Sequence, residues 1–318
     1  MTATQRTVAT GLGLGLVLLV AGWFLPKWLV SMSMLALSLG LVSLGVFVLM
    51  RSGMVPFGQG LVYAAGGYAA ALAFNKWGWT DALALSALGA LAGFLITLPF
   101  APFLARYRGI FFAMLTLALS MVMYGVLMKT EAMGGSDGFN VTRATLFGFK
   151  APDAYAAALL HSVVVTVAVV LGVLTRLYCD SARGLLSQAI RDNELRVEYL
   201  GVSVGRVVVT NLLIAGVLGG AGGALSILSL GHIDPQFSYW TTSGEFVFVA
   251  ILAGHQSAVA LFGASYVLEL VRSFSSSYFP NTWQLALGIF LLLVIRFLPV
   301  GLGSLATWFQ NKNNNQAP

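Results

Sequence analysis

The sequence predicts an all-α integral membrane protein with about ten transmembrane helices. Of its 318 residues, 58% are hydrophobic and only 9% are charged, whereas an ordinary soluble domain has about 25% charged residues. The mean hydropathy is +0.87. Apolar runs long enough to cross about 30 Å of hydrocarbon recur along the whole chain. A large soluble domain is therefore not expected.

Ten apolar runs mark the expected spans, at residues 8–25, 30–50, 56–74, 82–105, 109–129, 155–177, 207–229, 243–254, 258–274 and 282–299. A signal peptide is the alternative for the first run. Because no convincing small-x-small cleavage site precedes Pro26 and further spans follow, an uncleaved helix is expected. Residues 1–303 should then form the transmembrane domain, and residues 304–318 a polar C-terminal tail.

The distribution of lysine and arginine indicates the orientation of these spans. Ten spans place both termini on one side of the membrane. Most arginines, including those of the polar loop 178–206, fall on that same side, so the positive-inside rule puts both termini in the cytoplasm. Residues 130–154 then form the largest outer loop. The pI is about 9.6, but the basic residues are scattered over separate loops, and nucleic-acid binding is not expected.

Two stretches are unlike ordinary spans. Residues 51–60 interrupt an apolar stretch with three glycines and a proline, and residues 243–254 are too short to cross the hydrocarbon at about 1.5 Å per residue. Broken helices occur at membrane depth only where protein or water covers the backbone, and in transporters they often mark the substrate path. We therefore expect broken or half-helices near 51–60 and 243–257. A tight interhelical loop is the open alternative for 51–60.

Glycine and proline supply two further patterns. The stretches 53–56 and 231–235 each join glycine to proline after an apolar run, on opposite sides of the membrane, which is a weak sign of an inverted repeat. The spacings Gly216-x-x-x-Gly220 and Gly219-x-x-x-Gly223 favour close helix packing. A glycine-lined pore wall is the alternative for these glycines.

The longest polar run extends from Ser181 to Arg206 and mixes four arginines with three acidic residues. Helix-forming residues flank the pair Asn193–Glu194, and Gly201 ends the run. A compact, charged, helical loop between apolar spans is typical of a contact with a soluble partner.

Several kinds of chemistry are absent from the sequence. There is no G-x-x-x-x-G-K-[ST] motif, so the chain is not expected to bind nucleotide through a P-loop. The three histidines lack metal-ligand spacing, and no catalytic constellation is present, so neither a metal site nor an enzyme is expected. All eleven acidic residues are expected near span ends. Glu245 should support a helix start, and Glu269 should lie near the outer surface and pair with Arg272.

Four motifs resemble the LivM-type membrane subunits of branched-chain amino-acid ABC importers. They are RGIFFAMLTLA from Arg108, GGSDG from Gly134, GLLSQAIRDNE from Gly184 with LGV at 200–202, and residues 215–225 with IDP at 233–235. They occur in the family's order over nearly the whole chain. The departures from the family pattern lie at 51–60 and 253–256, inside the expected breaks, and they concern the substrate rather than the transporter class.

The resemblance implies a fold like the ten-helix type II ABC importers in a bacterial inner membrane. It also implies a LivH-like second permease subunit, two cytoplasmic ATPases that bind ATP and Mg, and a periplasmic substrate-binding protein. This chain would then carry no cofactor of its own. Its default cargo would be branched-chain or other small hydrophobic amino acids.

Candidate site residues follow from the same resemblance. The loop 181–206 would be the coupling helix, with ATPase contacts from Arg183, Arg191, Asp192, Glu194, Glu198 and Gly201. The translocation path is expected along Phe112, Met114, Thr116, Gly58, Gly254 and His255, although helix packing is the alternative for the first three. An outer gate or docking surface for the binding protein is expected at Gly135, Ser136, Asp137, Asp234 and Pro235, where a plain surface turn is the alternative for the glycine-rich part.

A different transporter class is the main alternative function. A secondary transporter or channel for a small neutral solute, such as urea or an amide, would need a coupling residue or a filter inside the membrane. The sequence places no such coupling residue at the expected middle of a span, and it shows no filter.

Overall fold

The computed structural model describes residues 3–146, 148, 152, 155–254, 258–278 and 282–297, and these residues are almost entirely helical. The α-helices, in chain order, are α1 (Ala3–Phe24), α2 (Lys27–Met50), α3 (Gln59–Trp77), α4 (Ala82–Leu104), α5 (Gly109–Lys129), α6 (Ala156–Asp180), α7 (Ala182–Asp192), α8 (Glu194–Tyr199), α9 (Val204–Leu230), α10 (Trp240–Ala253), α11 (Ala258–Tyr278) and α12 (Trp283–Phe297). Three 3₁₀ turns, η1 (Glu131–Met133), η2 (Gly135–Asp137) and η3 (Pro235–Ser238), and two short strands, β1 (Phe139–Asn140) and β2 (His232–Ile233), complete the described elements.

Each of the ten expected apolar runs overlaps one of these helices. Within the described residues, six helices are long and apolar enough to cross a membrane, namely α2, α4, α5, α6, α9 and α11. The helix α3 is 19 residues long, and α1, α10 and α12 contribute shorter apolar helices. The prediction of a helical membrane protein is therefore confirmed in its coarse form.

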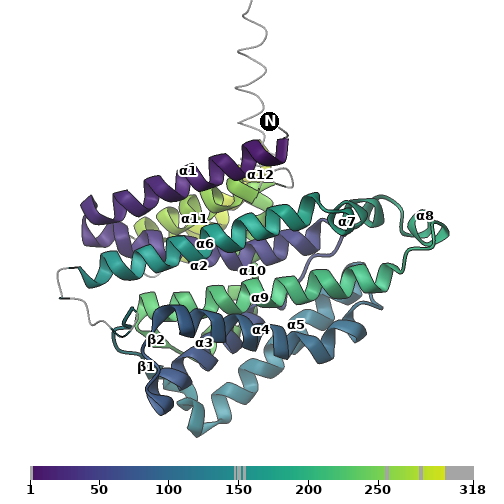
Figure 1. Ribbon diagram of the computed structural model, residues 1–318. Coiled ribbons are helices and arrows are strands. Elements are labelled where there is room, and N and C mark those ends of the chain that lie inside the picture. Colours follow the sequence, from purple (N-terminus) through teal and green to yellow (C-terminus); the bar gives the residue numbers. More distant parts are fainter. Residues whose placement is uncertain are drawn as a thin grey trace, which may run out of the picture.

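The two ends of the bundle differ in structure. At one end lie α7 and α8, and at the other lies the antiparallel pair β1–β2, in which Phe139 is opposite Ile233 (Figure 1). The helices run between these two ends. We refer to them as the α7–α8 end and the sheet end.

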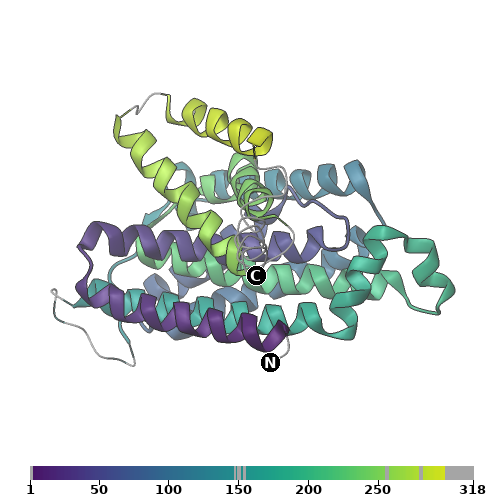
Figure 2. The same cartoon turned by 90° about the horizontal axis from the view of Figure 1, so that it is seen from above.

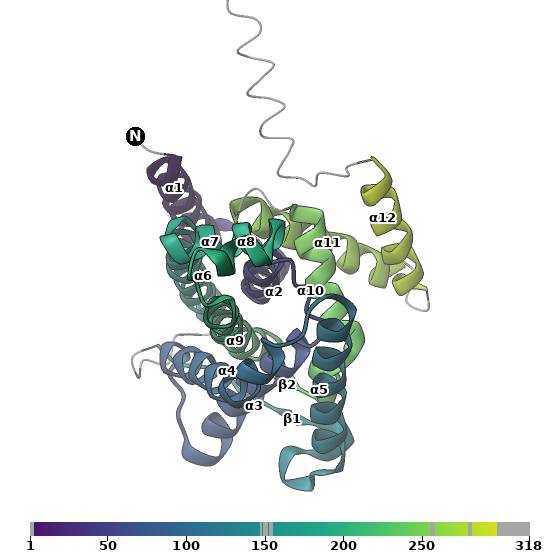
Figure 3. The ribbon, with the colours of Figure 1, turned by 90° about the vertical axis from the view of Figure 1, so that its right-hand side faces the viewer.

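The helices α2 and α9 form the centre of the bundle. The helix α2 packs against α9, α11, α6 and α10, and α9 also packs against α3 and α4. Viewed from the α7–α8 end, α1 and α6 flank this centre on one side, while α5, α11 and α12 lie on the other (Figure 3). The helix α11 crosses the bundle obliquely, and α12 follows it at the periphery (Figure 2).

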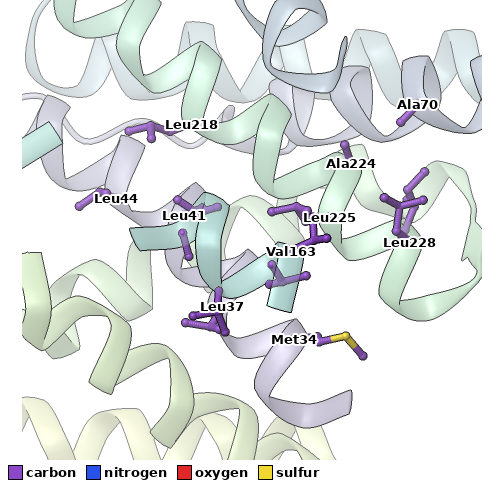
Figure 4. Packing of buried hydrophobic residues seen from close by; sticks show 14 of the residues in the cluster. Met34, Leu37, Leu41, Leu44, Ala70, Val163, Leu218, Ala224, Leu225 and Leu228 are labelled. Carbon is purple, nitrogen blue, oxygen red and sulfur yellow. The ribbon is translucent and has the colours of Figure 1, made fainter. Parts of the chain in front are cut away.

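Leucines at helical spacing build the interior of this centre. Leu37, Leu41 and Leu44 share one face of α2 and are almost completely buried. They belong to the same buried cluster as Leu218 and Leu225 of α9 (Figure 4). Because the apolar faces of α4, α5 and α6 remain largely exposed, the polarity pattern fits a bundle in lipid, whose outer surface is as apolar as its core.

Helices α3 and α10 both begin half-way along the bundle. Residues 51–58 are not helical; they lead from Arg51, which contacts the end of α6, to Gly58, which lies against Thr116 of α5. The stretch 51–60 is thus a break within the bundle rather than a surface loop.

The second break enters from the opposite end. Residues 231–239 lead from the sheet end to Ser238, whose carbonyl accepts a hydrogen bond of 2.7 Å from Ser120, near the middle of α5. The half-helix expected near 243–257 corresponds to α10, a helix of 14 residues from Trp240 to Ala253 that irregular backbone precedes; residues 255–257 lie outside the described part of the chain. The two breaks enter the bundle from opposite ends. This arrangement agrees with the weak inverted repeat seen in the sequence at 53–56 and 231–235.

The glycines of α9 are packing residues. A Cβ atom at Gly220 would collide with the carbonyl oxygen of Gly89, and one at Gly216 with Thr97. A Cβ atom at Gly223 would collide with the carbonyl oxygen of Tyr63. These positions let α9 approach α3 and α4 backbone to backbone, as the packing interpretation predicts.

This packing predicts a position-dependent effect of alanine along α9. Gly220→Ala should lower the free energy of unfolding by about 1–3 kcal/mol, because the added methyl group overfills a closed contact. Gly205→Ala is the matched control on the same helix, since nothing lies within 4 Å of a Cβ atom there. Thermal unfolding in detergent should separate the two variants, and equal midpoints would contradict the backbone-to-backbone contact.

Candidate functional site

The polar segment at the α7–α8 end folds as two short helices with side-chain caps. Ser181 caps α7 by accepting a hydrogen bond from the Gly184 amide. Asn193 has an extended backbone that ends α7, and its side chain caps α8 by accepting a 3.0 Å hydrogen bond from the Arg196 amide. Gly201 follows α8 with φ of 78°, a conformation that favours glycine. The expected helical segment and its glycine end are both confirmed.

A buried asparagine fixes this segment to the bundle. Asn211 of α9 is completely buried. Its Nδ2 donates hydrogen bonds to Ser52 Oγ at 3.2 Å and Ser187 Oγ at 3.0 Å, and its Oδ1 accepts one of 2.6 Å from Tyr178. One side chain thus ties the ends of α2 and α6 to α7. Sequence reasoning missed Asn211, although a lone amide in an apolar run was a usable signal.

Arg51 makes a second attachment at the same place. Its Nη2 donates to the carbonyl oxygens of Cys179 at 3.1 Å and Gly184 at 3.4 Å, which are backbone acceptors at the turn between α6 and α7. Gly184 lies so close to the backbone of Tyr178 and Cys179 that a Cβ atom would not fit. The turn is therefore both closely packed and charge-assisted.

Glu194 forms an ion pair inside the chain. Arg108, just before α5, donates from Nε to Oε2 at 3.0 Å and from Nη2 to Oε1 at 2.8 Å. This bidentate ion pair joins the first turn of α8 to the connection between α4 and α5. Glu194 was expected to contact a separate ATPase; the structure shows that its carboxylate already has a partner within the chain.

The remaining expected coupling residues lie on the outside of the segment. Arg183, Arg191, Asp192, Glu198 and Gly201 are all exposed. Beside them are three exposed apolar side chains, Leu195 (64% exposed), Tyr199 (88%) and Leu200 (78%), which we call the α8 patch. An apolar group rimmed by charges is typical of a protein contact surface. The sequence analysis had missed these three residues.

The two breaks meet each other through side-chain hydrogen bonds. The amide of Phe57 donates to Thr116 Oγ1 at 3.1 Å, and the amide of Gly60 donates to Ser243 Oγ at 2.9 Å. Gln59 is buried beside them and donates to the Ala215 carbonyl at 2.9 Å. A cavity of about 40 Å³ lies against Gly58 and Thr116, which is enough for a water molecule but not for an amino acid.

The expected path residues divide into two groups. Phe112 is completely buried and Thr116 nearly so, and Thr116 lies against Gly58. Met114 is 62% exposed on a different face of α5. Gly254 ends α10 with φ of 76°, and His255 lies outside the described residues. The structure thus brings Thr116 and Gly58 together, while Met114 and Gly254 lie elsewhere.

The outer residues come together at the sheet end. Gly138 lies against the backbone of Ile233 and Asp234, so the loop with Gly135, Ser136 and Asp137 is adjacent to the second break. Ser136 donates to Asp137 Oδ1 at 2.9 Å, and Asp234 caps η3 through the Gln236 amide at 2.8 Å. Pro235 is buried within η3.

One sequence expectation about charge is wrong. Glu245 was placed near a span end, but α10 begins half-way along the bundle, so the carboxylate lies in its interior. Arg272 of α11 donates from Nη1 to Glu245 Oε2 at 3.0 Å, and Glu269 lies one turn before Arg272 on the same helix. The carboxylate lies deeper than expected because irregular backbone precedes α10.

Comparisons with known proteins agree on one family. A family model described as the branched-chain amino acid transport system permease component matches residues 28–296. The high-affinity branched-chain amino acid transport system permease protein LivM of Escherichia coli (strain K12) is 27% identical over 315 residues, covering 90% of this chain and 73% of that protein. The protein of the same name from Salmonella typhimurium is 27% identical over 298 residues, covering 86% of this chain and 68% of its own length. No solved structure shows a significant match.

The Arg108–Glu194 pair makes a prediction about the α7–α8 segment. Glu194→Gln and Arg108→Gln should each increase local opening of α8, measured as faster hydrogen exchange at 194–199. Both side chains are about one-third exposed, so the coupling energy in a double-mutant cycle should be on the order of 1 kcal/mol or less. Additive effects of the two substitutions would show that the pair does not hold α8.

Proposed function

Because the chain belongs to the family of branched-chain amino acid transport system permease components, we propose that it is the transmembrane permease subunit of an ATP-driven importer. The proposed cargo is a branched-chain or other small hydrophobic amino acid. Two LivM relatives and the six helices able to cross a membrane support this proposal.

The proposed architecture is that of a type II importer with about ten spans. Helices α1 to α6 and α9 to α12 would be those spans within residues 1–303, with residues 304–318 as a tail. Both termini would be cytoplasmic in a bacterial inner membrane. The arginine-rich α7–α8 end supports this orientation.

The α8 patch is the observation that carries the coupling proposal. An apolar patch at the tip of the polar segment, rimmed by Arg191, Arg196 and Glu198, suits a groove on a cytoplasmic ATPase. The chain itself has no P-loop motif, so two separate ATPase chains would bind ATP and Mg. In this proposal Glu194 holds the coupling helix in place, and the exposed residues make the contact.

The rigid attachments suggest how movement of the α7–α8 segment would reach the membrane. Asn211 and Arg51 connect the segment to α2, α6 and α9, and Arg108 connects it to the start of α5. Since Thr116 of α5 accepts a hydrogen bond from the Phe57 amide and lies against Gly58, a shift of α7–α8 would be transmitted to the first break. Alternating access would follow from such a rigid-body shift.

The translocation path would run along the exposed face of α5. Phe111, Met114 and Val122 are exposed on this helix, and a LivH-like second permease subunit would cover them. A periplasmic substrate-binding protein would dock near Asp137 and Asp234 and deliver the amino acid there. His255 remains a candidate path residue.

One observation favours the alternative of a secondary transporter. The ion pair of Glu245 with Arg272 in the bundle interior is the kind of group that coupled carriers use. Reconstituted uptake decides between the two functions, since the ABC importer requires ATP hydrolysis and the binding protein, whereas a secondary transporter requires neither.

Truncating the α8 patch tests the coupling proposal. Leu200→Ala should weaken association with the ATPase about tenfold, equivalent to about 1.4 kcal/mol, and should lower amino-acid uptake with it. Leu91→Ala is the matched control, because Leu91 is also an exposed leucine and lies on α4, far from α7 and α8 along the chain. Wild-type ATPase binding by the Leu200→Ala protein would remove the α8 patch from the interface.

Single cysteines test the orientation. Cys179 is buried and is a poor reporter, so the substitutions are made in a Cys179→Ser background. Gln188→Cys on α7 should react with a membrane-impermeant thiol reagent only after cells are permeabilised, whereas Glu131→Cys should react in intact cells. Both parent residues are exposed. Reaction of Gln188→Cys in intact cells would invert the topology.

A further inference from the structure

A long apolar groove lies between α1, α6 and α11 at the periphery of the bundle. Its cavity has a volume of about 430 Å³, within the usual range of small-molecule pockets. Apart from Arg176 and Tyr266, every described residue that lines it is apolar or glycine. Leu14 and Val17 of α1, which form part of the wall, are 51% and 61% exposed. The groove therefore opens toward the surroundings of the bundle, which in a membrane protein are lipid.

The groove extends from the α7–α8 end to about the middle of the bundle. Helices α1 and α6 lie side by side and antiparallel (Figure 1), with Gly15 against Val169. The lining residues of α6 run from Val165 to Arg176, a length of about 16 Å at about 1.5 Å per residue. Half of a hydrocarbon core about 30 Å thick is about the same length. The groove thus matches one leaflet of a bilayer.

Tyr266 closes the groove at its inner end. The tyrosine hydroxyl is hydrogen-bonded to Ser33 of α2, and Ser33 Oγ lies 2.9 Å from His161 Nε2. His161 lies about one turn before Val165 on α6, toward the sheet end. Because these three side chains occupy the space beyond Val165, the groove is blind and does not continue into the other half of the bundle.

The mouth of the groove, at the α7–α8 end, is basic. The Arg176 side chain is 19% exposed, and its Nε pairs with Asp180 Oδ2 at 3.0 Å. A guanidinium carries five N–H donors, so its terminal amino groups can bind a second anion, with the geometry that suits a phosphate. Arg51 and the exposed Arg183 lie at the same turn between α6 and α7. Three arginines and one aspartate therefore give this mouth a net positive charge.

Exposed tryptophans mark the opposite membrane interface. Trp23, Trp28 and Trp77 are each exposed by half or more, and they lie where α1, α2 and α3 reach the sheet end. Tryptophan is enriched at the boundary between lipid and water. From Trp23 back to Val8, at the mouth of the groove, α1 rises about 22 Å. Arg176 thus lies a few ångströms inside the other interface, a depth from which an arginine reaches the head groups by snorkelling.

We propose that this groove binds one anionic phospholipid of the leaflet at the α7–α8 end. One acyl chain lies between α1, α6 and α11, and the phosphate binds at Arg176. The length of the groove fits a chain of one leaflet, and its charged mouth fits the head group. A transmembrane helix of a partner subunit has to cross the whole hydrocarbon core, whereas this groove ends at Tyr266.

Glycines in the walls provide variants that fill the groove. Gly11 of α1 and Gly263 of α11 both line it, and nothing lies within 4 Å of a Cβ atom at either position. Leucine at these positions therefore occupies the space of the acyl chain without colliding with the protein. Gly13→Leu is the matched control, because Gly13 also has nothing within 4 Å of a Cβ atom but does not line the groove.

The first experiment locates the acyl chain. The full-length chain, with any subunits that co-purify, is placed in nanodiscs with phosphatidylglycerol that carries a photoactivatable group within one chain. Labelling of residues 165–176 and 258–266 should exceed that of the exposed face of α4 at least fivefold. Gly11→Leu and Gly263→Leu should each reduce it at least fivefold, and Gly13→Leu should stay within twofold of wild type. Equal labelling of the groove and α4 would indicate ordinary boundary lipid and overturn the proposal, as would undiminished labelling of both groove variants.

The second experiment tests the head group. Diacylglycerol with the same photoactivatable chain but no phosphate should label the groove at least fivefold less than phosphatidylglycerol. Arg176→Gln should reduce phosphatidylglycerol labelling to that level, whereas Arg176→Lys should keep most of it because the positive charge remains. Equal labelling by the two lipids would overturn the phosphate site, and this comparison needs no variant to fold. Loss of groove labelling whenever a second permease subunit co-purifies would show that the partner covers the groove, and would also overturn the proposal.

Discussion

The structure depends on satisfying the backbone where two helices begin in the middle of a membrane-spanning bundle. Hydrocarbon offers no hydrogen bonds, so every amide and carbonyl exposed by a break needs a partner within the protein. Thr116 accepts from the amide of Phe57, Ser243 accepts from the amide of Gly60, and Ser120 donates to the carbonyl of Ser238. These three hydroxyl groups come from α5 and α10, so the position of each break depends on the other elements.

Close packing around α9 makes this arrangement possible. Its glycines admit the backbones of α3 and α4, which brings the start of α3 against Ala215 and allows Gln59 to bond its carbonyl. The same helix carries Asn211, which holds the α7–α8 segment. Thus α9 links the first break to the α7–α8 end. Its glycines make the contacts with α3 and α4, and the Asn211 amide makes the contact with the α7–α8 segment.

The sequence predicted the features that depend on local pattern. The apolar runs predicted the long helices. Asn193 and Gly201 predicted where α7 and α8 end, because capping and backbone conformation are local properties. It did not predict features set by tertiary contact. The Glu194 pair depends on Arg108, which is 86 residues away, and the depth of Glu245 depends on a break whose position the apolar pattern does not reveal. Likewise, the outward direction of Leu200 follows from packing.

The meeting of the two breaks also bears on how the chain is made. The amide of Gly60 and the hydroxyl of Ser243 are 183 residues apart in sequence, and Gln59 and its acceptor Ala215 are 156 apart. At about 5–20 residues per second, roughly ten to forty seconds of translation separate the start of α3 from its later partner. During that interval the N-terminal half of the protein lacks Ala215 and Ser243, the hydrogen-bond partners of Gln59 and Gly60 at the start of α3. The hydrogen bonds of Gln59 and Gly60 at the start of α3 can therefore form only after the C-terminal third of the chain has been made.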